Sequence, residues 1–240
     1  MTFNKEVAIL QFNSDKSYEK NLIRLVEAIK SNPKADILVA PEVLLTAFDY
    51  DNFDKVGEFY NKAIEQLTQI IDNQILVLTL VYKSDRGFVN RAVVINRGKV
   101  VYTQDKVKLF TIGDERKYFI SGDIESIIKF EIDGITYGIL ICFELRFKEI
   151  WKRLEGCDVI IIPSRWGLPR KAHLETLSQA LAIVNQCFVL LSNSSDSDMA
   201  SSSAIINPNG EAIRDDNSDI IYGEINSNDI KKIRRYISMK

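Results

Sequence analysis

The chain has 240 residues, 46% of them apolar, and a formal net charge of −2. This size and apolar content suffice to build one sizeable core, so we expect a single domain over residues 1–240. A nearly balanced charge predicts no basic surface for nucleic acid or anionic lipid, and without a signal peptide or an apolar run of about 18 residues we expect a cytoplasmic protein with no membrane partner.

The first part of the chain predicts strands that alternate with helices. Apolar runs indicate buried strands, and apolar residues three or four apart, such as Leu22, Leu25 and Ile29, indicate helices. The expected elements are a strand at 5–12, a helix at 17–30, a strand at 35–42, a helix that contains 64–71 and a strand at 74–82. This order is typical of a sheet with helices on its faces.

The middle of the chain predicts two antiparallel hairpins. Residues 90–104 and 127–142 each consist of two apolar segments around a short polar turn, at Arg97-Gly98 and Asp133-Gly134. Antiparallel pairs therefore enter the sheet structure. A purely parallel, doubly wound sheet is not expected, and the chain has no GxGxxG, Walker A or GxSxG motif.

The alternation resumes after Cys142. The expected elements are a helix at 147–156, a strand at 158–164, a helix at 173–186, a strand at 187–194, a hairpin at 203–213, a strand at 219–226 and a short basic helix capped by Ser227, Asn228 or Asp229. Helices between strands, together with hairpins, predict an α/β layered sandwich with mixed parallel and antiparallel sheets.

Three residues at the ends of predicted strands are candidates for chemistry. Cys142 lies between an apolar strand and a helix, where backbone N–H groups favour a thiolate. Glu42 follows a buried strand and is a candidate base, while Lys106 is a candidate to bind an oxyanion. Each also has an ordinary structural interpretation: a core cysteine, an acidic residue at a helix start, and an exposed lysine.

Histidine is the common base for a cysteine nucleophile, and this chain has one, His173. A Cys142-His173 dyad is therefore an alternative to Glu42 as the base. The other two cysteines, Cys157 and Cys187, begin predicted buried strands and are expected in the core. Three cysteines without CxxC spacing predict neither a disulfide framework nor a zinc site.

Several segments, in order along the chain, resemble the nitrilase superfamily, also called carbon-nitrogen hydrolases. They are APE around Glu42, DKVKLF around Lys106, GDERKYFISGD, GILICFELRF around Cys142, IIPSRWGLPRKAHLETLSQALAIVNQCFVLLSN and SAIINPNGE. The resemblance implies a Glu42-Lys106-Cys142 triad supported by Glu115, with the backbone N–H of Phe143 as an oxyanion donor. It also implies a four-layer αββα sandwich, no metal or cofactor, and homodimers or larger homo-oligomers. The short C-terminus favours a dimer.

The resemblance also implies a small-molecule amide substrate. The length and the WGLPR segment are most similar to the ω-amidase-type branch, which hydrolyses dicarboxylic monoamides and releases ammonia. Arg165, Trp166 and Arg170 lie in the loop that would face the ligand, where an arginine suits a substrate carboxylate. The alternatives are an N-carbamoyl amine or amino-acid amidohydrolase, then a nitrile hydrolase, and, from another class, a catalytically silent binding or assembly module.

Overall fold

The computed structural model describes residues 2–239, and its first sheet has six strands in the order β12-β1-β2-β3-β4-β5. Their bounds are Asn4–Leu10 (β1), Ile37–Val39 (β2), Ile75–Ser84 (β3), Gly87–Asn96 (β4), Lys99–Asp105 (β5) and Ile220–Asn226 (β12). The three central strands β1, β2 and β3 are parallel, whereas β12, β4 and β5 pair antiparallel to their neighbours. The mixed character predicted from the hairpins is confirmed.

The second sheet also has six strands, in the order β11-β10-β9-β8-β7-β6. Their bounds are Phe130–Ile132 (β6), Ile135–Ile139 (β7), Val159–Ser164 (β8), Phe188–Asn193 (β9), Ala204–Ile206 (β10) and Ala212–Arg214 (β11). Strands β7, β8 and β9 are parallel, and the remaining pairs are antiparallel. Each sheet thus has a parallel centre, whose strand ends can carry functional side chains on one edge.

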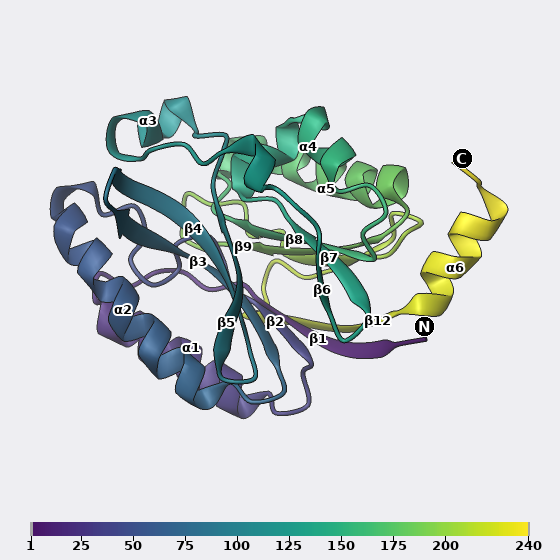
Figure 1. Ribbon diagram of the computed structural model, residues 1–240, viewed down its shortest axis with the longest axis horizontal. Coiled ribbons are helices and arrows are strands. Elements are labelled where there is room, and N and C mark those ends of the chain that lie inside the picture. The colour runs from purple at the N-terminus through teal and green to yellow at the C-terminus, as the bar shows by residue number, and fades with distance from the viewer. Residues whose placement is uncertain (1, 240) are drawn as a thin grey trace.

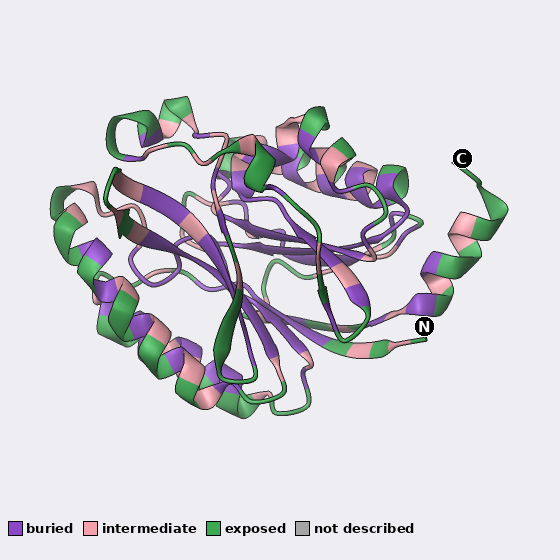
Figure 2. Ribbon diagram, in the orientation of Figure 1, coloured by how far each residue is buried: buried purple, intermediate pink, exposed green. Residues whose placement is uncertain are grey.

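Helices cover the outer face of each sheet, as Figure 1 shows. Helices α1 (Tyr18–Ser31) and α2 (Phe53–Ile70) lie against the first sheet, while α4 (Lys148–Arg153) and α5 (Lys171–Asn185) lie against the second. Buried residues line the space between the sheets and the inner faces of the helices (Figure 2). The result is the α/β fold that was expected, four layers in the order αββα.

The layers follow from the apolar pattern of the elements. Helix α1 starts at Ser17, whose side chain accepts a hydrogen bond from the N–H of Lys20, and it buries Leu22, Leu25 and Ile29 against the first sheet. The opposite face of that sheet contributes Ile9 to a core shared with the second sheet. Alternate residues of one strand therefore belong to different cores.

Several predicted boundaries were wrong by a few residues. The strand expected at 35–42 is limited to Ile37–Val39, and β3 continues to Ser84, where a tight turn leads into β4. The last helix, α6 (Ser227–Tyr236), is capped by Asn226, because its side-chain oxygen accepts the N–H groups of Asn228 and Asp229. No helix in the described range is both long and apolar enough to cross a membrane.

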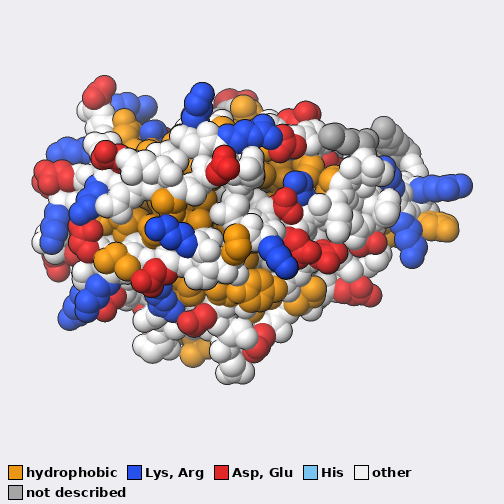
Figure 3. All heavy atoms as spheres, turned by 90° about the horizontal axis from the view of Figure 1, so that it is seen from below, with side chains coloured by type: hydrophobic (Ala, Val, Ile, Leu, Met, Phe, Trp, Pro, Cys, Tyr) orange, Lys and Arg blue, Asp and Glu red, His pale blue; other side chains and the backbone are white. Residues whose placement is uncertain are grey.

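The surface carries both signs of charge. On the face shown in Figure 3, lysine and arginine side chains are intermingled with aspartate and glutamate, with hydrophobic side chains between them. Short helices η2 (Thr111–Gly113) and α3 (Glu115–Tyr118) follow β5, and α6 lies beside the N-terminus, apart from the four layers (Figure 1). The strand ends that face α3 and α5 hold the polar site.

Candidate active site

Three of the predicted residues follow the ends of strands and meet between the two sheets. Glu42 lies three residues after β2, Lys106 directly follows β5, and Cys142 lies three residues after β7. The N–H of Glu42 donates to the carbonyl oxygen of Ser164, at the end of β8, over 3.2 Å, which joins the two sheets at this edge. Strand ends of both sheets thus build one site.

The Lys106 ammonium joins two carboxylates. Its Nζ lies 2.7 Å from Glu42 Oε1 and 2.7 Å from Glu115 Oε1, and all three side chains are buried. Glu115 also accepts the N–H of Phe110 with its second oxygen, at 2.8 Å. Such a buried ion cluster is tolerated because charge and hydrogen bonds compensate the loss of solvation.

The ammonium keeps its proton. Burial alone would lower the pKa of Lys106, but the attraction of Glu42 and then of Glu115 outweighs it, so the pKa lies above its ordinary value. Burial raises the pKa of Glu115, and Lys106 opposes that rise. Lys106 is therefore a fixed positive charge beside Cys142, suited to hold a negative oxygen.

Cys142 occupies a strained turn. Strand β7 ends at Ile139, and Cys142 begins the 3-10 helix η4 (Cys142–Arg146) with a φ of +47°. The sequence had placed Cys142 at the end of the strand; the structure ends the strand earlier and gives the cysteine a left-handed backbone. Such a conformation is costly for a residue with a Cβ and persists only where the surroundings enforce it.

The environment of Cys142 favours the neutral thiol. Burial, followed by the nearby Glu42 carboxylate, raises its pKa above the ordinary value, and Lys106, the Ser164 hydroxyl and the backbone N–H of Arg165 only partly oppose this. A buried thiol of this kind needs a base within reach of its proton. The carboxylate of Glu42 is close enough to influence the pKa of the Cys142 thiol electrostatically.

Glu144, which was not among the predicted site residues, joins the segment after Lys106 to the segment before Cys142. Its Oε1 accepts the N–H of Val107 at 2.6 Å, and its Oε2 accepts the N–H of Ile141 at 2.7 Å. These donors belong to the residues directly after Lys106 and directly before Cys142. Burial raises the pKa of Glu144 to about 7, and the backbone N–H groups oppose a larger rise.

Asn90 was also missed. It lies in β4, fully buried, and its Nδ2 donates to Glu42 Oε1 at 2.8 Å, while its carbonyl oxygen accepts the N–H of Lys106 at 2.8 Å. An asparagine beside the apolar run 92–95 of β4 was the signal available in the sequence. Arg146, four residues after Cys142, carried no comparable signal and was missed as well.

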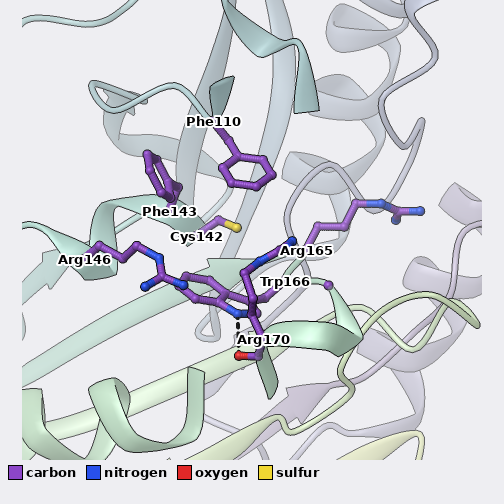
Figure 4. A pocket seen from close by; sticks show the side chains of 8 residues that line it. Phe110, Cys142, Phe143, Arg146, Arg165, Trp166 and Arg170 are labelled. Carbon is purple, nitrogen blue, oxygen red and sulfur yellow. Dashed lines mark hydrogen bonds between the residues drawn. The ribbon is translucent and has the colours of Figure 1, made fainter. Parts of the chain in front are cut away.

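A small pocket opens over the sulfur of Cys142. It is lined by Phe110, Cys142, Phe143, Arg146, Arg165, Trp166, Gly167 and Arg170 (Figure 4). The guanidinium of Arg146 lies 4.7 Å from the ring centre of Trp166, and that of Arg170 lies 5.3 Å from the ring centre of Phe110. Within residues 2–239, neither guanidinium is ion-paired with a carboxylate.

The arginines of the 165–170 loop have different environments. Arg165 points away from the sulfur in Figure 4, and its guanidinium is ion-paired with Asp196 at 2.7 Å. Arg170 turns toward the pocket and lies above Gly167, where an added Cβ would come within 3.0 Å of its Nη2. Of the two predicted carboxylate-binding candidates, Arg170 is therefore the one with a free guanidinium at the pocket.

The remaining predicted residues lie around the same pocket or behind it. The Trp166 indole N–H donates to the carbonyl oxygen of Arg170 at 2.9 Å and fixes the loop, as the dashed line in Figure 4 shows. Phe143 packs against Phe110 with ring centres 5.1 Å apart. His173 Nδ1 lies 3.0 Å from Arg146 Nη2, so its contact is with an arginine of the pocket.

The buried cluster is not built to hold a metal. Among residues 2–239, no group of three or more histidine, cysteine, aspartate or glutamate side chains is arranged around a position for an ion. The space between the carboxylates of Glu42 and Glu115 is occupied by the Lys106 ammonium. The chemical groups at hand are a thiol, carboxylates, an ammonium group and backbone N–H groups.

Known proteins are similar to this chain in sequence and in fold. The chain is 28% identical to a 2-oxoglutaramate amidase of Bacillus subtilis (strain 168), over 96% of this chain and 94% of the relative. It is 29% identical to the omega-amidase YafV of Escherichia coli (strain K12), over 74% and 71%. These relatives are amidases, as the sequence resemblance implied.

Two solved structures support the fold. Nit3 of Saccharomyces cerevisiae, a member of branch 10 of the nitrilase superfamily, superimposes with a TM-score of 0.85 at 21% identity, over 99% of this chain and 95% of that one. A carbon-nitrogen hydrolase of Helicobacter pylori G27 gives 0.87 at 20% identity, over 97% and 92%. The family model for carbon-nitrogen hydrolases matches residues 6–235, and the chain belongs to that family.

Proposed function

We propose that this protein is an ω-amidase-like enzyme that hydrolyses the terminal amide of a small dicarboxylic monoamide. The observation that carries the substrate class is the pair of guanidinium groups, Arg146 and Arg170, that lines the pocket of Cys142 without a carboxylate partner in the described chain. A substrate carboxylate would supply the missing charge through a charge-assisted hydrogen bond. The amidase relatives support the same class.

In the proposed reaction, Cys142 attacks the amide carbonyl while Glu42 takes the thiol proton. The negative oxygen of the tetrahedral intermediate is held by the Lys106 ammonium and the backbone N–H of Phe143. Glu42 gives the proton to the nitrogen as the C–N bond breaks, and ammonia leaves. A water molecule, deprotonated by Glu42, then hydrolyses the thioester and regenerates the thiol.

Glu115 has a supporting part in this proposal. Its carboxylate accepts a second hydrogen bond from Lys106, in addition to the one that Glu42 accepts, and is itself held by the N–H of Phe110. The ammonium therefore needs no rearrangement when charge develops on the substrate oxygen, which is the condition for strong electrostatic stabilisation. Trp166 supports the pocket by holding the backbone of Arg170.

The test is ammonia release from a matched set of amides by wild type, Cys142→Ala and Cys157→Ala. Succinamate and butyramide have the same number of carbons, but only succinamate has a carboxylate, and we expect turnover of succinamate and 2-oxoglutaramate alone. Cys142→Ala should be inactive, while Cys157→Ala, a core change, should keep activity. Equal turnover of butyramide would contradict the substrate class, and preference for an N-carbamoyl amino acid would favour the carbamoyl alternative. Inactivity on every amide, together with slow alkylation of Cys142, would favour a binding module.

We also propose a homodimer that packs through α5. Ile183 and Val184 on this helix are neighbouring large apolar side chains that are about half exposed, at 51% and 47%, and a second copy of the chain would cover them. Light scattering should give the mass of two chains, and Val184→Glu should lower it to one. A monomeric wild type would contradict this proposal without affecting the catalytic one.

A further inference from the structure

The two oxygens of the Glu42 carboxylate have different environments. Lys106 Nζ and Asn90 Nδ2 both donate to Oε1, at 2.7 and 2.8 Å. The other oxygen, Oε2, is buried and has no hydrogen-bond partner in the described part of the protein. Leaving a buried polar atom unpaired costs free energy, so such an atom in a folded protein calls for an explanation.

Asn90 produces this asymmetry and is placed by the sheet. Its backbone oxygen accepts the N–H of Lys106 at 2.8 Å, so one residue of β4 contacts Lys106 through its backbone and Glu42 through its side chain. The amide nitrogen must face the carboxylate, because the amide oxygen would repel it. That oxygen, Oδ1, is buried without a partner in the described chain. The contact with Glu42 is therefore the one that the side chain makes.

We propose that Asn90 is a positioning residue that keeps Glu42 Oε1 for the Lys106 ion pair and reserves Glu42 Oε2 as the base. This inference rests on the proposed function and adds an atomic assignment to it. The terminal torsion of a glutamate is soft, so a carboxylate held by one donor can turn and exchange its oxygens. Two donors on Oε1, from β4 and from the residue after β5, fix the rotation and leave the lone pairs of Oε2 free.

The proton then has a defined path. As the S–C bond forms, the thiol proton of Cys142 moves to Oε2, and the same proton goes to the substrate nitrogen as the C–N bond breaks. In the second half, a water proton moves to Oε2 as the C–O bond forms, and it passes to the sulfur as the C–S bond breaks. Every proton that leaves a nucleophile is delivered to a leaving group, so no other base is required.

The experiment compares Asn90→Leu and Asn90→Asp with the matched control Asn96→Leu. Both Asn90 variants lack the amide donor but differ in packing, so a shared effect reports on the hydrogen bond. Asn96 is a buried asparagine of the same strand that donates to the carbonyl oxygen of Gln74, away from the site. Steady-state kinetics on succinamate over pH and the alkylation rate of Cys142 are the readouts, in variants that melt cooperatively.

We expect the Asn90 variants to lose about 10- to 100-fold in kcat, within the range of general acid–base catalysis, with little change in KM. The pH profile of kcat/KM should differ from that of wild type, because the Glu42 carboxylate loses a hydrogen-bond donor. Alkylation of Cys142 should slow in parallel, while Asn96→Leu should behave like wild type.

A wild-type kcat and pH profile in either folded Asn90 variant would overturn the inference. Its failure is distinguishable from failure of the proposed function through Cys142→Ala. If that variant is inactive and the Asn90 variants are unaffected, only the role of Asn90 is wrong. If Cys142→Ala retains turnover, the proposed function itself is wrong.

Discussion

The two sides of the Cys142 pocket balance their charges in different ways. On the side of the first sheet, Lys106 lies between Glu42 and Glu115, so the charges are compensated within the protein. On the side of the second sheet, Arg146 and Arg170 reach the pocket with aromatic rings beside them and no carboxylate partner in the described chain. The first arrangement is complete before substrate binds, whereas the second lacks a negative charge that a ligand can bring.

This difference suggests that the two sides of the pocket have separate functions, one in the reaction and one in substrate selection. A compensated cluster is rigid and keeps its protonation state, which suits groups that act on the reacting bond. Uncompensated guanidinium groups at a pocket wall favour an anionic ligand and so determine selectivity more than rate. Substitutions on the two sides should therefore differ in kind: loss of kcat and of fold stability on one side, loss of affinity on the other.

The largest effect is expected from Lys106→Met. The change leaves two buried carboxylates without their cation, which typically destabilises a protein by about 3–5 kcal/mol, and removes an oxyanion donor worth roughly 10²–10³ in kcat. Denaturant unfolding and succinamate turnover measure the two losses. Lys108→Met is the matched control, because Lys108 is partly exposed and ion-paired with Glu149, a pair worth at most about 1 kcal/mol. A Lys106→Met protein with near-normal stability would show that the cluster is not compensated in the way described.

An intermediate effect is expected on the other side of the pocket. Arg170→Met should raise KM for succinamate by about 10- to 100-fold, the range for a hydrogen bond between charged groups, and leave the alkylation of Cys142 unchanged. Arg165→Met, in the same loop, should instead lower the free energy of unfolding, because it leaves Asp196 without its partner. Kinetics and melting curves on both variants test the contrast. If Arg165→Met raised KM as much as Arg170→Met, the two arginines would not have separate roles.

These two arginines also mark the limit of what the sequence predicts. The expectation that the four layers follow from alternating strands, helices and hairpins was confirmed, since apolar periodicity is local. Which guanidinium faces the pocket depends on Asp196, which is 31 residues away along the chain and invisible to any local pattern. Asn90 was missed because its partner Glu42 follows another strand, and Glu144 because its contact with the N–H of Val107 joins it to a distant segment. The cap of α6 differed by a single residue, within the usual uncertainty of helix ends.

The candidate triad was predicted from the family resemblance and not from local sequence patterns. Position alone left Glu42, Lys106 and Cys142 with ordinary structural interpretations, and the order of the family motifs brought them together. The structure places Glu42 and Lys106 in direct contact, and Glu115 contacts the same ammonium. Their catalytic roles remain proposals that the Cys142→Ala and Lys106→Met measurements test.

The smallest effect concerns Glu144, which lies between the two sides; its hydrogen bonds come from backbone N–H groups, and the nearby Lys106 cation adds an attraction. Its pKa rises from 4.5 to about 7 on folding, because burial disfavours the charge. The native state therefore binds this proton more tightly than the unfolded state. The resulting stabilisation is complete below pH 4.5 and is lost as the pH rises to about 7.

Glu144→Gln removes this pH dependence. Between pH 4.5 and 7, the free energy of unfolding of wild type should therefore fall relative to that of the variant, by on the order of 2 kcal/mol. Urea unfolding at several pH values measures it. Glu149→Gln is the control: the hydrogen bond from Lys108 lowers the pKa of Glu149, so its effect has the opposite sign and is small on an exposed side chain. Parallel stability curves for wild type and Glu144→Gln would mean that the three N–H groups compensate the buried carboxylate as fully as Lys106 compensates Glu42. Backbone N–H dipoles and a fixed cation would then stabilise a buried carboxylate equally well at this site. The two sides of the pocket would differ only in the unpaired arginines.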